Sequence, residues 1–475
     1  MSKKANNLLE GPIAKSLFTL AVPIVLANIL QAGYQLIDAF WVGRLGGSAV
    51  AAVSVSAPIT FLTIALGVGL AVAGSTLIAQ YFGAKNQKMV DHVAAQTLLM
   101  IVIVSVVLGG IGYALTPWIL HLMGVAPDVY AGAVGFMRVS FIGLVFNFFF
   151  FMFQSIMRGV GEAKLPVYIV LGTVLLNFVL DPLFIYGWGA IPAMGVMGAA
   201  VATVGTQSIA ALIGLLVLLK GKYGIHLSLG DFKPDFAFIK RAFFLGFPAS
   251  IEQSARALGL TVLTFLIASF GTLTVAAYGV GSNVLQVIMI PAMGLSMAIS
   301  TLVGQNIGAG NIKRAAEIGR LGALIGFGAL TGIGVIVFAF APYFISFFVP
   351  GDEAVIAMGA TFLRIMALSW GFMAVQLSLT GVLRASGNMM ATMVIALVSQ
   401  WVLQFPLAYV LSKHTALGTN GLWWSFTITN VLIAVVTMLW YAKGDWKKTK
   451  ITTEEERLTE KVSEEIIIEE GIRQN

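Results

Sequence analysis

The sequence predicts an all-α polytopic membrane protein with twelve transmembrane helices, arranged as two repeats of six. Three observations support this fold class. The 475 residues are 58% hydrophobic and only 10% charged, whereas soluble domains average about 25% charged residues. Long apolar segments recur along the chain, and the two halves of the chain match at a fixed offset. Cysteine is absent, which excludes disulfides and zinc–thiolate sites.

The apolar segments are long enough to cross a bilayer, since a spanning helix needs about 20 apolar residues. Several are longer than this minimum, which indicates tilted or bent helices. We predict twelve spans, at residues 16–43, 49–81, 93–117, 131–156, 166–187, 195–219, 240–270, 274–306, 316–342, 357–380, 389–411 and 418–442.

The basic residues fall mainly in one set of alternate loops and at the two chain ends. The opposite loops hold only Arg44 and Lys413. By the positive-inside rule, both termini are expected to be cytoplasmic. We expect a multi-pass protein of the plasma (inner) membrane. Because the basic residues are spread over short loops rather than gathered in one patch, we expect no nucleic-acid partner.

The two halves repeat. At an offset of 225, Gln80 and Gly83 match Gln305 and Gly308, and at an offset of 226 Arg158 matches Arg384. With six spans per repeat, both copies enter the membrane from the same side, and a transport site is expected near mid-membrane, between or within the two lobes. The predicted organisation is an N-lobe (1–219), a cytoplasmic connector (220–239), a C-lobe (240–442) and a charged, solvated tail (443–475).

Three acids lie well inside predicted spans, away from the span ends, and the first is Asp38. A carboxylate within the hydrocarbon layer is costly and marks an ion or substrate pathway by default. Gln31, Tyr34 and Asp38 share one helical face, and Pro23 permits the helix to bend. The alternative is that Asp38 ends its span at the outer interface and is solvated there.

The second acid, Asp181, lies at a depth similar to that of Asp38. Thr173, Asn177 and Asp181 share one face of the fifth span, and Pro182 follows directly. Two nearby buried carboxylates hold a proton more tightly than a solvated one, which is the property that a proton-coupled carrier needs. The alternative is a structural hydrogen-bond cluster.

The third acid, Glu252, has Arg256 one turn further along the seventh span. Such an i, i+4 pair is charge-neutral, so its role is either structural or in ion coupling. The second lobe also offers amides and methionines, among them Asn283 and Met289, that suit a permissive cavity for amphipathic organic molecules. The alternative is that amides join helices and methionines fill gaps.

Enzyme chemistry is not indicated. The four histidines lie in or beside loops, and the chain has no HExxH, P-loop or clustered metal-ligand pattern. We therefore expect neither an enzyme nor a cofactor, and any pumping must use an ion gradient.

The ordered motifs resemble the multidrug and toxic compound extrusion (MATE) family over about residues 10–442. The resemblance rests on Pro23 with Asp38, on Asn177 with Asp181-Pro182, and on the motifs LGGSAVAAVSV, QYFGAKN, MRGVGEAKLP and GVMGAAVAT. It implies two lobes that form a V, and outward antiport of cationic or amphipathic compounds against H⁺ or Na⁺.

The resemblance also implies roles for individual residues. Asp38 and Asp181 would be the coupling carboxylates, with Asn177 and Thr203 as supporting ligands. Gln31 and Tyr34 would line the cavity, and Pro23 would be a hinge. The tenth span lacks the acid of sodium-coupled members, which favours the DNA-damage-inducible-protein-F-like (DinF-like) branch and H⁺, with Na⁺ at Asp38 and Asp181 left open.

The prediction is therefore a monomeric, H⁺-driven multidrug exporter. Its expected partners are membrane lipid and small organic cations or amphipathic drugs. Two alternatives remain within the same superfamily, a flippase for a lipid-linked precursor and a metabolite exporter. A channel or structural protein is a third, and it would show passive flux insensitive to a gradient.

Overall fold

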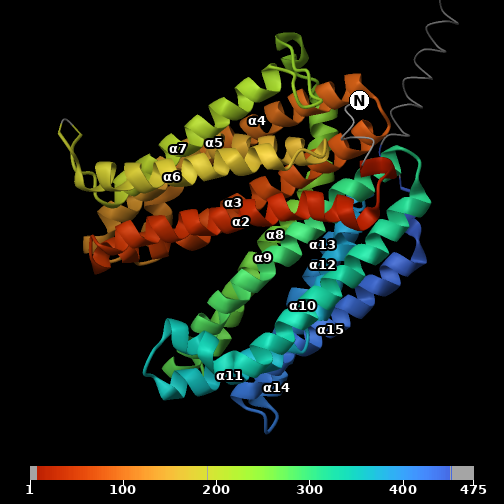
Figure 1. Ribbon diagram of the computed structural model, residues 1–475. Coiled ribbons are helices and arrows are strands. Elements are labelled where there is room, and N and C mark those ends of the chain that lie inside the picture. Colours follow the sequence, from red (N-terminus) through yellow and green to blue (C-terminus); the bar gives the residue numbers. More distant parts are fainter. Residues whose placement is uncertain (1–7, 190, 450, 452–475) are drawn as a thin grey trace, which may run out of the picture.

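The computed structural model describes residues 8–189, 191–449 and 451, and it is built from helices (Figure 1). Within those residues, the β-type backbone pairing consists of one isolated bridge between Trp188 and Ile191. The N-lobe helices are α2 (Ile13–Gly43), α3 (Gly47–Gly83), α4 (Gln87–Leu122), α5 (Pro127–Gly159), α6 (Lys164–Tyr186) and α7 (Val196–Leu219).

The second half of the chain repeats this order with two broken spans. It comprises η1 (Leu229–Phe232), α8 (Phe236–Ala268), α9 (Thr272–Gly308), α10 (Ile312–Phe348), α11 (Glu353–Ala367), α12 (Trp370–Ala385), α13 (Met389–Leu397), η2 (Val398–Gln404), α14 (Phe405–Lys413), α15 (Thr419–Lys443) and η3 (Asp445–Lys447). In the described part of the chain, 11 helices are long and apolar enough to cross a membrane, when α13, η2 and α14 are counted as one. Helices α11 and α12, bent by 51°, make the twelfth when the pair is counted as one span. The twelve predicted spans are confirmed.

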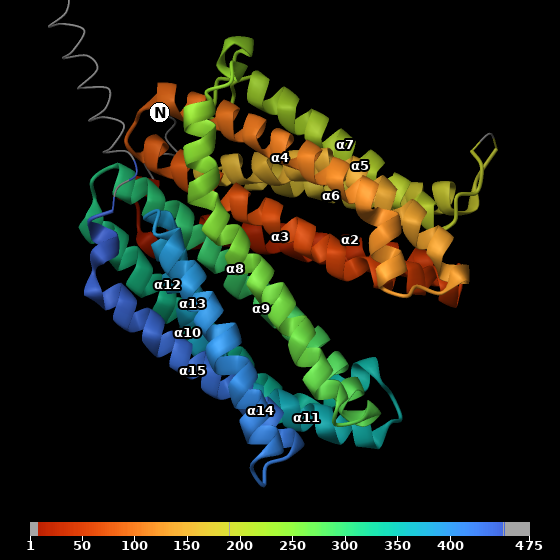
Figure 2. The same ribbon diagram turned by 180° about the vertical axis from the view of Figure 1, so that it is seen from behind.

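The two bundles form a V (Figures 1 and 2). One arm holds α2–α7 and the other α8–α15. The arms meet along α3 against α8 and along α2 against α9. We call the closed end, where α3, α5, α9 and α12 end, the apex, and the opposite, open end the mouth. The resemblance implied this V, and the structure contains it.

The apex is closed by two glycine contacts that the repeat relates. A Cβ at Gly83 would lie 1.9 Å from the carbonyl oxygen of Gln305, and a Cβ at Gly308 would lie 1.9 Å from that of Gln80. Only glycine permits this approach, because any side chain would overlap the facing carbonyl. The sequence repeat is therefore also a structural symmetry about the line where the lobes meet.

The same glutamines fasten the lobes through their side chains. Gln80 Nε2 donates to the carbonyl of Ala385 at 2.7 Å, and Gln305 Nε2 donates to that of Gly159 at 2.9 Å. Near the end of the described chain, the Ile451 N–H donates to Gln80 Oε1 at 3.1 Å. Each lobe thus donates a side-chain hydrogen bond to a helix end of the other.

The connector is held against α4 of the N-lobe. Gln96 Nε2 donates to the carbonyls of Asp231 and Lys233 at 2.9 and 2.8 Å, and its Oε1 accepts from the Asp235 N–H at 2.9 Å. A glutamine side chain therefore replaces the hydrogen bonds that this irregular segment cannot make to itself. Most of the predicted solvated tail, residues 452–475, lies outside the described residues.

Gly83→Ala and Gly308→Ala should each destabilise the protein. An added Cβ must displace a backbone carbonyl at the apex, and overpacking of this kind costs about 1–3 kcal/mol. The measurement is the thermal unfolding temperature of the purified protein in detergent. Gly110→Ala is the matched control, since a Cβ there meets nothing within 4 Å. An equal response of all three variants would show that the contact does not hold the apex.

Candidate functional site

The N-lobe brings together the four residues proposed for ion coupling. Asp38 lies on α2 and Asp181 on α6, and the two carboxyl groups face one another within hydrogen-bonding reach. Asn177 Nδ2 donates to Asp181 Oδ1 at 3.0 Å, and Thr203 Oγ1 on α7 donates to Asp38 Oδ2 at 3.3 Å. Asp181 and Asn177 are fully buried and Asp38 is half-buried. Three helices thus converge on one carboxylate pair.

Tyr34 extends this network rather than facing an open surface. It is 3% exposed, and its hydroxyl lies 2.6 Å from Thr206 Oγ1. Thr206 donates its own hydrogen to the carbonyl of Thr203 at 2.9 Å, so Tyr34 is the donor to Thr206. Thr206 was not among the residues predicted from the sequence, although its position one turn after Thr203 on α7 was a usable signal.

The network has more acceptors than donors. Asp38 Oδ1, Asp181 Oδ2 and Asn177 Oδ1 are buried and receive no hydrogen bond from the described residues. Buried oxygens without a donor are costly. A proton added to one carboxylate would become a donor to a neighbouring oxygen, and a small cation would be attracted by all three. The chemistry available here is the binding of H⁺ or a monovalent cation.

Helix α2 connects this site to the opposite lobe. Its first half is buried against the C-lobe, where Leu17, Leu20 and Ile24 join a cluster with residues of α9 and α10. Its second half carries Tyr34 and Asp38 into the N-lobe. Pro23 lies in the first half, near the change of partner, in a helix that continues unbroken through it. The half-buried Gln31 lies two turns before Asp38.

In the C-lobe, Glu252 is bound by two arginines. Arg256 Nη2 lies 3.2 Å from Glu252 Oε1, as the i, i+4 spacing indicated, and Arg384 of α12 binds the same oxygen. Glu252 is fully buried, while the side chain of Arg256 is 32% exposed and that of Arg384 15%. The sequence relates Arg158 and Arg384 only as repeat positions, and it predicts no ion pair between Arg384 and Glu252.

A cavity of about 210 Å³ lies between the lobes near the apex. Met289 lines it, as does Gln253, whereas Asn283 is exposed on α9 outside the lining. The lining comprises Val68, Val72, Ser75, Ser155, Arg158, Gln253, Arg256, Met289, Met293, Ser296, Met297, Ser300, Leu377 and Arg384. We call this the central cavity. Its polar and apolar residues come from both lobes.

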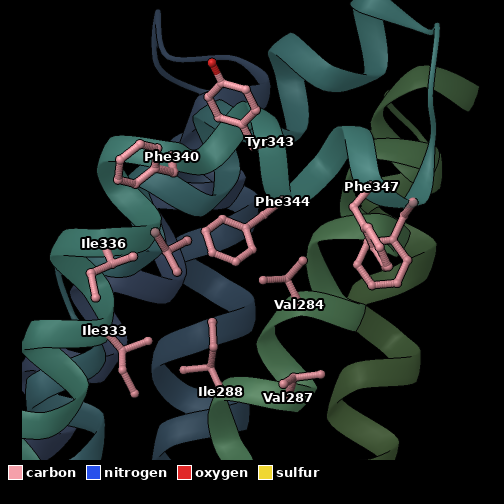
Figure 3. Close-up of a pocket in the computed structure, with 11 residues that line it drawn as sticks. Val284, Val287, Ile288, Ile333, Ile336, Phe340, Tyr343, Phe344 and Phe347 are labelled. Carbon is pink, nitrogen blue, oxygen red and sulfur yellow. The ribbon is translucent and has the colours of Figure 1, made fainter.

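A larger pocket of about 640 Å³ lies between α9 and α10 and is almost entirely apolar (Figure 3). It forms where α10 is kinked at Phe340, two residues before Pro342. Val284 and Ile288 of α9 face Ile336 and Phe344 of α10 across it (Figure 3). Without a charged or amide group, this surface suits a hydrocarbon chain and offers no site for ion chemistry.

The MatE family model matches residues 23–183 and 248–410, one segment in each lobe. The chain belongs to the MatE family. It is 30% identical over 453 residues to the probable multidrug resistance protein YpnP of Bacillus subtilis (strain 168), covering 95% of this chain and 100% of that protein. It is 28% identical over 422 residues to the multidrug resistance protein NorM of Vibrio cholerae, covering 87% of this chain and 92% of that protein.

Solved structures agree with this assignment. A multidrug resistance MATE family transporter in an outward-facing conformation superimposes with a TM-score of 0.87 at 26% identity, covering 94% of this chain and 100% of that one. The protein is thus a multi-pass membrane transporter of a multidrug-efflux family, and its relatives are transporters rather than enzymes.

Arg384→Ala should destabilise the protein more than Arg256→Ala. Arg384 is the more buried partner of Glu252, and removing one member of a buried ion pair costs about 3–5 kcal/mol. Thermal unfolding in detergent provides the measurement. The double variant Glu252→Gln with Arg384→Gln removes both charges and should recover part of the loss. Equal effects of the two single variants would mean that Arg384 does not hold the buried carboxylate.

Proposed function

We propose that the protein is a monomeric antiporter that exports amphipathic organic compounds, cations among them, across the plasma membrane in exchange for H⁺. The coupling site is the pair Asp38 and Asp181. The observation that carries this proposal is the set of buried acceptor oxygens in the pair and in Asn177 that receive no hydrogen bond from the described residues. A carrier that binds and releases H⁺ needs such a group, one whose hydrogen bonds are complete only when a proton is present.

Helix α2 supplies the link between protonation and lobe movement. Its second half bears Asp38, and its first half is packed into the C-lobe. Protonation changes which hydrogen bonds Asp38 makes to Asp181 and Thr203, and therefore how α2 sits against α6 and α7. Pro23 removes one helical hydrogen bond, so α2 can bend there at low cost. The two arms of the V would move in response.

H⁺ fits the chain better than Na⁺ as the coupling ion. Residues 354–385, which include the whole predicted tenth span, contain no Asp or Glu. The buried acid of the C-lobe, Glu252, is already neutralised by Arg256 and Arg384. The site at Asp38 and Asp181 remains for a cation, and H⁺ needs only one oxygen where Na⁺ needs several. This supports placement in the DinF-like branch.

The direction of opening follows from the loop charges. Lys85, Lys164 and Lys313 lie at the apex, while the mouth has Arg44 and Lys413 among acidic residues. The positive-inside rule then favours a cytoplasmic apex. On this orientation the V opens outward, in the state that would release cargo and take up H⁺.

Proteoliposomes loaded with a fluorescent amphipathic dye should release it faster when the outside is made acidic. Asp38→Asn and Asp181→Asn should each slow this pH-driven release on the order of tenfold or more, because the proton site is lost. Two dyes are used in separate assays, ethidium as a cation and 2-naphthoate as an anion. An imposed Na⁺ gradient without a pH gradient should drive neither.

Asp128→Asn is the matched control, since Asp128 is exposed in the first turn of α5 and should leave release unchanged. Release of both dyes that ignores the pH gradient, or pH-driven release that survives in both coupling variants, would exclude this mechanism. Release driven by Na⁺ alone would make Na⁺ the coupling ion instead.

A further inference from the structure

Three arginines line the central cavity, and they come from both lobes. Arg158 lies at the end of α5 in the N-lobe, and Arg256 and Arg384 lie on α8 and α12 of the C-lobe. Arg158 and Arg384 are the repeat-related pair found in the sequence. The lobes therefore each place one equivalent guanidinium at the same cavity.

The positive charge of this cavity exceeds the negative charge beside it. Among the described residues, Glu252 is the acid bound to Arg256 and Arg384. It neutralises one of the three positive charges. Arg158 makes no side-chain hydrogen bond or ion pair with the described residues. The Nε atoms of Arg256 and Arg384 are buried and also lack an acceptor there. The central cavity thus keeps guanidinium N–H donors and a net positive charge that can interact with a ligand.

Helix ends do not account for all three arginines. Arg158 and Arg384 lie in the last turns of their helices, where a cation interacts favourably with the helix dipole. Arg256, however, lies in the interior of α8, twelve residues before the helix ends at Ala268. The helix dipole also does not explain why the side chains of all three arginines line one cavity. The arrangement suits an anion, since guanidinium groups bind carboxylate and phosphate through paired hydrogen bonds.

The remaining lining is apolar and adaptable. Met289, Met293 and Met297 follow one another along α9, and Val68 and Val72 face the cavity from α3. Methionine side chains fit differently shaped apolar groups. A cavity of about 210 Å³ exceeds the engineered 150 Å³ cavity that accepts a benzene ring. It therefore has room for a small ring system beside a head group.

We propose that the central cavity binds amphipathic organic anions. The carboxylate or phosphate head lies between Arg158 and Arg384, and the apolar body rests on the methionines of α9. This inference rests on the proposed export function, and it names the class of cargo that the central cavity binds. The expectation of cationic or amphipathic cargo came from the resemblance to the MATE family.

A bound anion would also join the lobes. Its head would bridge one guanidinium from each arm of the V, directly beside the apex. The binding site for cargo is then separate from the H⁺ site in the N-lobe, and the two communicate through the relative position of the lobes rather than by competition for one group.

The test compares 2-naphthoate with its neutral isostere 2-naphthamide. Binding is measured by equilibrium dialysis against the full chain in phosphatidylcholine nanodiscs, with empty nanodiscs subtracted. Wild-type protein should bind 2-naphthoate at least about tenfold more tightly than 2-naphthamide, as expected from charge-assisted hydrogen bonds to a guanidinium. Equal affinities would overturn the proposal, whatever the variants do.

Arg158→Gln should remove most of this preference for the anion, and Arg158→Lys should restore part of it. Arg138→Gln is the matched control, because Arg138 stacks on the Tyr113 ring at 4.7 Å and does not line the cavity. A preference that survives in Arg158→Gln, or that is lost equally in Arg138→Gln, would also overturn the proposal.

Two further experiments distinguish a lipid head group from a soluble anion, and a failure of H⁺ coupling from a failure of the anion site. In nanodiscs that contain phosphatidylglycerol, weaker binding of 2-naphthoate would show that an anionic lipid head group occupies the same site, and unchanged binding would favour a soluble anion. Both results support an anion site. Asp38→Asn should bind 2-naphthoate like the wild type, so failure of H⁺ coupling and failure of this inference give different results.

Discussion

The close approach of α3 and α9 at the apex is the constraint on which the rest of the structure depends. In a membrane, helices gain little from burying apolar surface against one another, because the lipid is equally apolar. Close backbone packing and hydrogen bonds must hold the two lobes instead. Gly83 and Gly308 allow the packing, and Gln80 and Gln305 supply the hydrogen bonds. With the apex fixed, the arms diverge and the central cavity lies just beyond it.

Two groups of charged side chains lie apart from each other in the described part of the molecule. The N-lobe holds two acids and no arginine in its network, and the central cavity holds three arginines with one acid. Mixing them would let the acids and arginines neutralise each other, and neither set could then bind an ion from outside. Keeping them apart leaves one site that attracts H⁺ and one that attracts anions. Helix α2, shared between the lobes, is the element that can relate the two.

Much of this architecture could be predicted from the sequence. Hydropathy predicted the twelve spans, and the repeat matched Gln80 with Gln305 and Arg158 with Arg384 as equivalent positions of the two lobes. The proximity of Asp38 and Asp181 could be anticipated because both lie on polar helical faces at a similar depth. These features depend on patterns that are local or that recur at a fixed offset.

Other features could not be predicted from the sequence and became visible only in the folded structure. The bond from Arg384 to Glu252 joins residues 132 positions apart, and hydropathy does not specify which helices are neighbours. Tyr34 shares a face with Asp38, yet its neighbour on that side is Thr206 of α7 rather than open space. The 51° bend between α11 and α12 and the π-helical turn η2 have no clear signal, since the apolar pattern continues through both.

The central claim is that protonation of Asp38 and Asp181 moves the lobes. It can be tested by pulsed electron spin resonance between labels on Leu122→Cys and Thr415→Cys, two exposed mouth positions in a chain without other cysteines. An antiporter must close its mouth with H⁺ bound, so the distance between the labels should shorten on acidification in otherwise wild-type protein. It should not respond to pH when both aspartates are replaced by asparagine. The same response to acid in that variant would contradict the account.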